Sequence, residues 1–327
     1  MENGSSKSVE PSVGDDVLLA PYHYITTKMP GKHIRSELSK AFNHWLNIDE
    51  LKLQIIMELV EMLHNASLMI DDIEDNSVLR RGHPVTHNVY GVPSTINSAN
   101  YAYFLALSKC LQLGHPKAIE IFSEQMLELH RGQGKELHWR DSYICPTEYE
   151  YEEMVKQKTG GLFGLAVQLM QLFSECTDDF TYLVGSLALY FQIRDDYINL
   201  TSTDYAKEKS YGEDITEGKF SYPIINVLRS EQGKDDIILN ILRRRTTDID
   251  VKKYCISLIR EREGFIATES KLDWLMVSIR SCVNGFPQNP LLSALLSKID
   301  INNSTVCVDD AKYIQCDGGK KDVIREQ

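Results

Sequence analysis

Residues 51–75 read LKLQIIMELVEMLHNASLMIDDIED, a long apolar segment that ends in a cluster of acids. Apolar residues recur every three to four positions up to Ile70, which predicts a helix with one face in a core. Asp71 and Asp75 follow one helical turn apart and share a face. Two carboxylates this close repel each other unless a cation lies between them, and Mg²⁺ prefers oxygen ligands. The motif indicates a magnesium site, although a solvated acidic helix end would show the same pattern.

A second acidic cluster repeats this arrangement far along the chain. Asp195-Asp196-Tyr197-Ile198-Asn199 closes the apolar run of residues 187–193, and Asp195 and Asn199 again stand one turn apart. Two helices that each end in oxygen ligands would face each other across the mouth of a cavity. Such a pair suits a diphosphate held by several Mg²⁺ ions. Because Asn199 carries no charge, we expect Asp195 to be the main ligand on this side.

Composition limits the classes of function. The chain has 327 residues, 43% of them hydrophobic, and a formal net charge of −12, which argues against non-specific nucleic-acid binding. Its 7 cysteines are scattered and include no Cys-x-x-Cys pair, which favours reduced thiols in a cytoplasmic protein over disulfides or a zinc site. Residues 1–16 lack an apolar signal core, and residues 161–173 are too short to span a bilayer. We therefore expect no transmembrane segment.

Nearly every segment between the chain ends has the helical period. Pro93-Ser94-Thr95 and Pro146-Thr147 have the composition of helix starts, and Gly114-His115-Pro116 that of a break. Sustained period-2 alternation and hairpin turn signals are missing from the sequence. The pattern predicts an all-α fold of about a dozen helices around a single core. We expect a disordered leader at residues 1–16, one domain at 17–301 and a polar, disordered tail at 302–327.

Several cations follow or precede the acidic clusters and would suit a diphosphate. Arg80-Arg81 lies just beyond the first cluster, and arginine binds phosphate bidentately. Lys158-Thr159 precedes Gly160-Gly161, a pair expected to interrupt a helix and turn both side chains toward one point. For any one of these residues taken alone, a solvated surface position is an equally simple interpretation. The remaining candidates are Lys32, Arg35, Lys209 and Lys219.

His64 stands seven positions before Asp71 and on roughly the same helix face. From the sequence alone a hydrogen-bonded core histidine is the simpler interpretation. Glu61 and His64 also form a Glu-x-x-His pair, but di-iron bundles need two such pairs on different helices. No other histidine of the chain follows a glutamate at this spacing, which argues against a di-iron protein.

These residues together resemble the trans-isoprenyl diphosphate synthase family, over about residues 18–301. Several stretches are similar to the eukaryotic geranylgeranyl diphosphate synthases within it: residues 61–67, 79–82, 129–134, 158–164 and 191–197. The resemblance implies a helical isoprenoid synthase fold, antiparallel helices around a deep central cavity. It implies Mg²⁺-dependent head-to-tail condensation of isopentenyl diphosphate with dimethylallyl, geranyl or farnesyl diphosphate to geranylgeranyl diphosphate. It also implies a homo-oligomer, at least a dimer.

The resemblance assigns roles to individual positions. The metal would be held by Asp71, Asp75 and Asp195, which with Lys158 form the predicted catalytic set. The allylic diphosphate would contact Arg80, Lys158, Thr159, Gln192, Lys209 and Lys219. Isopentenyl diphosphate would be held by Lys32, Arg35, His64 and Arg81. His64 is thus predicted to be a ligand only through the resemblance.

Product length is expected to depend on residues above the first acidic cluster. Ala66 and Ser67 lie about one turn before Asp71, and both are small, so no aromatic ring closes the cavity there. By resemblance Tyr103, Phe104 and His130 would form a deeper floor, which implies a product of twenty carbons. Two alternatives stay open, a class I terpene cyclase and a non-catalytic regulatory subunit. The cations of the second diphosphate site argue against the former, and the presence of both acidic clusters against the latter.

Overall fold

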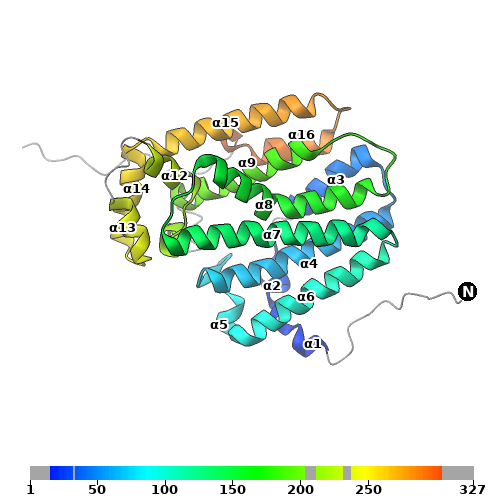
Figure 1. Cartoon of the computed structure of the whole chain (residues 1–327), viewed down its shortest axis with the longest axis horizontal. Helices are drawn as coiled ribbons and strands as arrows, with labels where there is room; N and C mark the ends of the chain where they lie inside the picture. Colours follow the sequence, from blue (N-terminus) through cyan, green and yellow to red (C-terminus); the bar gives the residue numbers. More distant parts are fainter. Residues whose placement is uncertain (1–14, 32–33, 203–210, 231–236, 304–327) are drawn as a thin grey trace, which may run out of the picture.

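A computed structural model describes residues 15–31, 34–202, 211–230 and 237–303. Over these residues the chain forms fifteen α-helices, one β-hairpin with two residues in each strand, and a 3₁₀ turn (Figure 1). The predicted all-α fold is therefore confirmed. The elements in chain order are α1 (Asp15–Leu18), α2 (Ala20–Lys28), α3 (Ile34–Leu46), α4 (Glu50–Glu74), β1 (Leu79–Arg80), β2 (His83–Pro84), α5 (Thr86–Tyr90), α6 (Val92–Gln112), α7 (Pro116–Ser142), α8 (Glu148–Gln171), α9 (Thr181–Thr201), α11 (Glu213–Glu217), α12 (Tyr222–Arg229), α13 (Ile237–Arg244), α14 (Ile249–Glu261), α15 (Gly264–Val283), α16 (Pro290–Ile299) and η2 (Ile301–Asn303).

The long helices lie side by side, with α4 among them (Figure 1). α7 packs against α8, α8 against α9, and α9 against α15, while α4 packs against α6, α8 and α3. The short helices α13 and α14 lie together at one end of the molecule (Figure 1). This packing gives α4, α7, α8 and α9 a shared interior, into which both acidic clusters are carried.

The predicted helix starts are present and have clear physical causes. Thr147 caps α8 by accepting a hydrogen bond from the backbone nitrogen of Glu150, and the Glu150 carboxylate accepts one from the Thr147 nitrogen in return. α6 and α7 each begin with proline in the first turn, where its missing N–H leaves no hydrogen bond unmade. Gly114, between these two helices, has a φ of 67°, a conformation that favours glycine.

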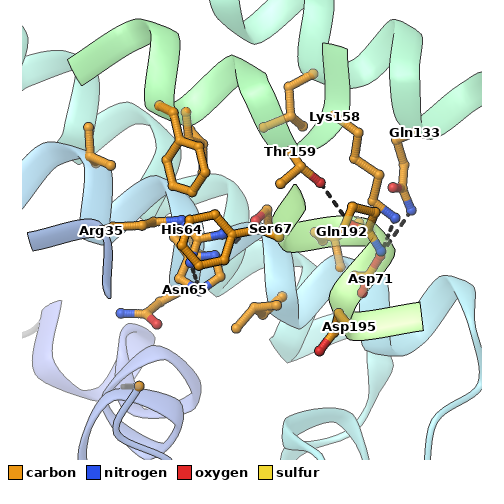
Figure 2. A pocket seen from close by; sticks show the side chains of 18 of the residues that line it. Arg35, His64, Asn65, Ser67, Asp71, Gln133, Lys158, Thr159, Gln192 and Asp195 are labelled. Carbon is orange, nitrogen blue, oxygen red and sulfur yellow. Dashed lines mark hydrogen bonds and ion pairs between the residues drawn. The ribbon is translucent and has the colours of Figure 1, made fainter. Parts of the chain in front are cut away.

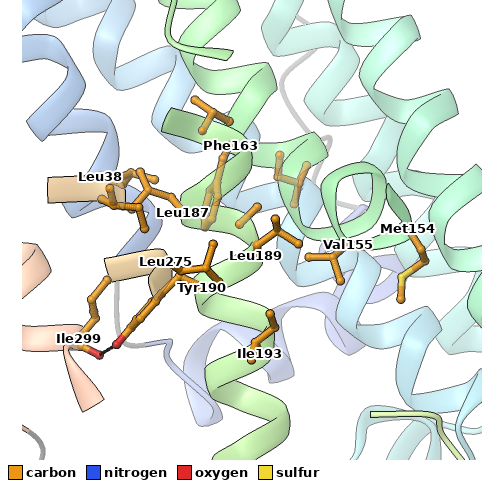
Figure 3. Packing of buried hydrophobic residues seen from close by; sticks show 14 of the residues in the cluster. Leu38, Met154, Val155, Phe163, Leu187, Leu189, Tyr190, Ile193, Leu275 and Ile299 are labelled. Carbon is orange, nitrogen blue, oxygen red and sulfur yellow. Dashed lines mark hydrogen bonds between the residues drawn. The ribbon is translucent and has the colours of Figure 1, made fainter. Parts of the chain in front are cut away.

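The core packs α3, α8, α9, α15 and α16 together (Figure 3). Leu187, Ile193 and Leu275 are fully or almost fully buried in it. The Tyr190 hydroxyl, also buried, donates a hydrogen bond of 3.2 Å to the carbonyl oxygen of Ile299 and accepts one of 3.0 Å from the Ile301 nitrogen. These bonds fix the end of α16 to α9 and satisfy the buried hydroxyl.

The prediction that Gly160-Gly161 interrupts a helix is wrong, because α8 is continuous through both glycines. The close approach is instead made by Gly132 on α7. A Cβ atom there would lie 2.6 Å from the Lys158 nitrogen, so only glycine lets the two helices come this close. The contact sets the position of Lys158 on α8.

α4 is the one helix in the described ranges whose length and mean hydropathy of 1.2 would allow it to cross a membrane. It packs against α3, α6 and α8, as the core helix of a globular protein does. The cysteines of the described part, from Cys110 to Cys282, form no disulfide with one another. The predicted leader and tail lie almost wholly outside the described residues, so these boundaries stay predictions.

Candidate active site

A cavity of about 410 Å³ opens between α3, α4, α7, α8 and α9. Its apolar wall includes Val60, Leu129, Leu162, Phe163 and Phe191. Most of the predicted site residues line it: Arg35, His64, Ser67, Asp71, Asp75, Arg80, Arg81, Tyr103, His130, Lys158, Thr159, Gln192, Asp195 and Lys219. The cavity therefore gathers residues from sequence positions 35 to 219 into one site. Lys32 and Lys209 lie outside the described residues.

At one end of the cavity Asp71 lies among donors from α7 and α8 (Figure 2). Its Oδ1 is 3.3 Å from Lys158 Nζ and accepts a hydrogen bond of 3.2 Å from Gln133 Nε2. The same Gln133 nitrogen donates to Glu74 at 2.7 Å. The sequence singled out Asp71 and Asp75 of this cluster, but the Glu74 side chain lines the cavity as well.

Asp72 points away from the cavity and into the protein, where only 1% of it is exposed. Both of its oxygens accept hydrogen bonds of 2.9 Å from Arg80 Nε, and Arg80 Nη2 is 2.7 Å from Oδ1. Arg80 Nη2 also lies 3.6 Å from Asp71 Oδ2. Asp72 therefore holds the Arg80 guanidinium beside the catalytic candidate Asp71.

Glu136 separates the two lysines of the site. Its carboxylate forms a short ion pair with Lys158 and lies 3.5 Å from Lys219 Nζ. Burial raises the pKa of Glu136, but the two ammonium groups outweigh burial and lower it. In turn, burial lowers the pKa of Lys158, while Asp71 and Glu136 raise it by more. Both lysines thus stay charged inside the protein, where they can meet an anion.

Asp75 ends α4 and also faces the cavity. Burial, together with the negative charges of Glu217 and Asp71, raises the pKa of the Asp75 carboxyl. A cluster of carboxylates that repel one another favours the binding of a cation. Within the described residues, no three carboxylates, imidazoles or thiols converge into a closed metal site. This donor set fits Mg²⁺, which commonly takes one or two carboxylates and completes its shell with water and substrate phosphate.

The second acidic cluster divides its residues between the cavity and the interior. Asp195 is exposed and lines the same cavity as Asp71, from α9 (Figure 2). Asn199 is buried, and its side-chain oxygen accepts a hydrogen bond of 3.2 Å from the Asp214 nitrogen. Asn199 therefore anchors the segment around α11, and the structure leaves Asp195 as the member of the predicted pair that faces the cavity.

Asp196 is a buried acceptor of several hydrogen bonds. It accepts from the Tyr151 hydroxyl at 2.6 Å, from Gln192 Nε2 at 2.9 Å and from the Tyr222 nitrogen at 2.9 Å. Lys219 Nζ lies 3.6 Å away. Because Gln192 also accepts a hydrogen bond of 2.8 Å from the Thr159 hydroxyl, Asp196 helps to orient both residues, which are predicted to contact the allylic diphosphate.

The opposite end of the cavity carries the predicted isopentenyl diphosphate residues (Figure 2). Arg35 Nη1 donates a hydrogen bond of 2.9 Å to His64 Nε2, and Arg81 donates a short one to the Met29 carbonyl. Burial, and then the charge of Arg35, lowers the pKa of His64, so the ring is neutral at pH 7. Burial, followed by repulsion from Arg81, lowers the pKa of Arg35 to about 10. The positive charges of Arg35 and Arg81 repel each other, and this repulsion favours the binding of an anion.

The predicted chain-length residues do not all reach the cavity. Ser67, Tyr103 and His130 line it, and the Tyr103 and His130 rings meet edge-on at 6.2 Å. Ala66 is fully buried but packs toward α2 and α6, so its prediction as a cavity residue is wrong. Phe104 is 70% exposed and points outward, because neighbouring helical residues are about 100° apart. Of the three residues predicted to form the floor, Tyr103 and His130 therefore line the cavity and Phe104 does not.

Sequence reasoning missed the polar face of α7. Gln133, Glu136 and Arg140 recur at helical spacing on this face and contact Asp71, Lys158 and Asp75 respectively. The signal was present, since polar residues recur three and four positions apart in the segment that follows Gly132. The sequence could not show that this face, rather than another one, meets the acidic cluster.

Comparison with known proteins agrees with this geometry. Polyprenyl synthetase is the family that matches residues 15–259. The chain belongs to the polyprenyl synthetase family. A geranylgeranyl pyrophosphate synthase of Aspergillus fumigatus, spyE, is 52% identical over 272 residues, which cover 83% of this chain and 76% of the relative. A protein of Matsumurasca onukii named terpene synthase is 53% identical over 285 residues, which cover 87% of this polyprenyl synthetase and 93% of the relative.

A second fungal relative extends this agreement. The geranylgeranyl pyrophosphate synthase atmG of Aspergillus flavus is 52% identical over 275 residues, which cover 84% of this chain and 80% of the relative. Family membership makes this polyprenyl synthetase a prenyltransferase with the all-α isoprenoid synthase fold.

Proposed function

We propose that this polyprenyl synthetase condenses isopentenyl diphosphate with allylic diphosphates to give geranylgeranyl diphosphate. The observation that carries the proposal is one cavity with two separate cationic ends. Lys158 and Lys219 lie beside the acidic clusters, and Arg35 and Arg81 lie with His64 at the other end. A condensation needs two diphosphate sites, whereas a cyclase needs one. The relatives named geranylgeranyl pyrophosphate synthase support the twenty-carbon product.

The side chains suit the charge changes of this reaction. The allylic carbon–oxygen bond breaks, and the electron pair leaves with the diphosphate, whose added charge is stabilised by the ammonium groups of Lys158 and Lys219. The double bond of isopentenyl diphosphate then attacks the allylic carbon. Apolar residues such as Phe163 and Leu162 keep water from the cation, which limits its hydrolysis. The departed diphosphate is the proposed base that removes the final proton.

We propose that Asp71, Asp75 and Asp195 hold the Mg²⁺ ions of the loaded enzyme. Bound there, the ions would neutralise charge on the leaving diphosphate. The donor set supports this assignment, because Asp71 and Asp75 lie on one helix face and Asp195 faces the same cavity from α9. Lys32 and Lys209 complete the two diphosphate sites in this proposal.

The activity is tested with the purified chain, Mg²⁺, labelled isopentenyl diphosphate and each allylic primer in turn. We expect incorporation of label and a twenty-carbon product by chromatography. Asp71→Asn should lower turnover by a factor of about 100 or more while leaving the helical circular dichroism unchanged. If the chain instead released diphosphate from geranylgeranyl diphosphate alone, it would be a cyclase. No turnover with any primer would indicate a regulatory subunit.

We also propose that the enzyme is a dimer that uses the outer faces of α6 and α7. Phe104 and Leu111 on α6 are 70% and 57% exposed, and Leu127 on the adjacent α7 is 53% exposed. A Cβ on Gly134 of α7 would meet no atom within 4 Å, so no contact within the described part of the chain explains a glycine there. Glycine in a helix interior is destabilising, and close packing of a second copy would account for it.

Light scattering after size-exclusion chromatography tests this surface. The unaltered chain should have the mass of a dimer or a larger assembly, and Leu111→Asp should shift the mass toward a monomer. Trp274→Asp, on the exposed face of α15, is the matched control and should leave the mass unchanged. A monomeric unaltered chain would refute the proposed dimer.

We also propose that the enzyme is cytoplasmic, because its scattered cysteines favour reduced thiols over disulfides.

A further inference from the structure

Arg140 of α7 contacts the end of α4 where the first acidic cluster lies. Its Nη1 donates to Asp75 Oδ1 at 2.6 Å, and its Nη2 donates to the Glu74 carbonyl at 3.2 Å. The Arg140 side chain is 7% exposed, and that of Asp75 is 16% exposed. One guanidinium therefore holds both the carboxylate of Asp75 and the last backbone turn that carries it.

A third bond fixes the guanidinium itself. Arg140 Nε donates to Asp141 Oδ1 at 3.0 Å, and the same oxygen is 2.6 Å from Arg245 Nη2. With acceptors on three of its nitrogens, the planar group has little freedom to rotate. An arginine restrained in this way can set the orientation of the carboxylate that it holds.

We propose that Arg140 is a positioning residue for Asp75 in magnesium and diphosphate binding. The ion pair engages Oδ1, and Oδ2 is the oxygen that would bind the cation in this proposal. Mg²⁺ demands a nearly ideal arrangement of ligands, and groups that orient a ligand commonly change metal affinity strongly. The inference rests on the proposed function, because it takes Asp75 as a metal ligand.

The direction in which Mg²⁺ affinity changes when Arg140 is replaced shows whether Arg140 orients Asp75 or acts only through its charge. Removing a positive charge near Asp75 would by itself favour Mg²⁺ binding. Losing the orientation of the carboxylate would weaken binding instead. A purely structural contact between α7 and α4 would lower thermal stability and leave the magnesium dependence unchanged.

The test is calorimetric titration of the full chain with inorganic pyrophosphate at a series of Mg²⁺ concentrations. For Arg140→Met we expect a rise of about 10-fold or more in the Mg²⁺ concentration needed for half-maximal pyrophosphate binding. Arg140→Lys keeps the charge without the fork of donors, and it should show a smaller rise in the same direction. Arg131→Met, on the same helix with a side chain 60% exposed, is the matched control and should behave like the unaltered chain.

Asp75→Asn in the same assay distinguishes the two levels of the argument. If Asp75→Asn leaves the magnesium dependence unchanged, Asp75 is not a ligand and the proposed metal site is wrong. If Asp75→Asn raises the Mg²⁺ concentration needed for half-maximal binding and neither Arg140 variant does so, only the role of Arg140 is refuted. A lower Mg²⁺ requirement in Arg140→Met would also refute it, since Arg140 would then act as a competing charge. If Arg140→Met does not fold, Arg140→Lys alone decides the outcome.

Discussion

The buried ion pair of Asp72 and Arg80 gives a prediction whose size follows from the structure. The two residues are 1% and 8% exposed, and their groups meet at 2.7–2.9 Å. Asp72→Asn keeps the shape of the side chain but leaves the guanidinium buried without its main counter-charge. Breaking such a pair costs about 3–5 kcal/mol. Because Asp71 lies 3.6 Å from Arg80 and compensates in part, we expect a loss of about 3 kcal/mol.

Chemical and thermal unfolding measure this loss. At about 2 °C per kcal/mol for a chain of this size, the melting temperature should fall by about 6 °C. A double-mutant cycle with Arg80→Met then isolates the pair. The double variant should be more stable than the sum of the single losses predicts, by about 2 kcal/mol, because it leaves no buried charge alone.

An exposed ion pair supplies the control for this cycle. Glu37 and Lys298 lie 2.8 Å apart with side chains 42% and 55% exposed, so Glu37→Gln should change stability by less than about 1 kcal/mol. The assignment of a buried and coupled pair would be refuted if the Asp72 and Arg80 variants lost stability additively and each lost as little as Glu37→Gln does.

Three further predictions concern the helix packing, the cavity floor and the buried histidine. Gly132→Ala should destabilise the fold by about 1–3 kcal/mol in urea unfolding, because its Cβ would lie 2.6 Å from the backbone of α8. Gly134→Ala should not destabilise the fold of the monomer, because its Cβ would meet no atom within 4 Å. Tyr103→Ala should lengthen the product in chromatography and Phe104→Ala should not; equal product profiles would contradict the assigned floor. The folded protein lowers the pKa of His64, so as the pH falls the unfolded chain protonates this imidazole before the folded chain does. The contribution of His64 to stability is therefore fully present above about pH 6.5 and is lost as the pH falls below that value. Urea unfolding at about pH 7.5 and 5.5 should show a smaller pH dependence for His64→Gln than for the unaltered chain, and an unchanged dependence would count against this residue.

The amino-acid sequence alone predicted the helical class, the starts of α6 and α8, the break between α6 and α7, and the two acidic clusters. Helical period, proline and capping residues act within a few positions along the chain, so local rules suffice for α4, α7 and α8. The spacing of Asp71 and Asp75 alone was enough to place both on one face. The family resemblance then extended the site to isolated residues such as His64, for which the local pattern favoured a core position.

Which neighbour each side chain meets depends on the tertiary packing. Ala66 and Ser67 are adjacent and both small, yet one packs toward α6 and the other lines the cavity. Tyr103 and Phe104 divide in the same way. The rotation of each helix about its axis is set by close packing with other helices, as at Gly132, where α7 and α8 approach too closely for any side chain. The contact of Gly132 with Lys158 joins residues far apart in the sequence, and so does the ion pair of Arg140 with Asp75. Local sequence cannot encode either one.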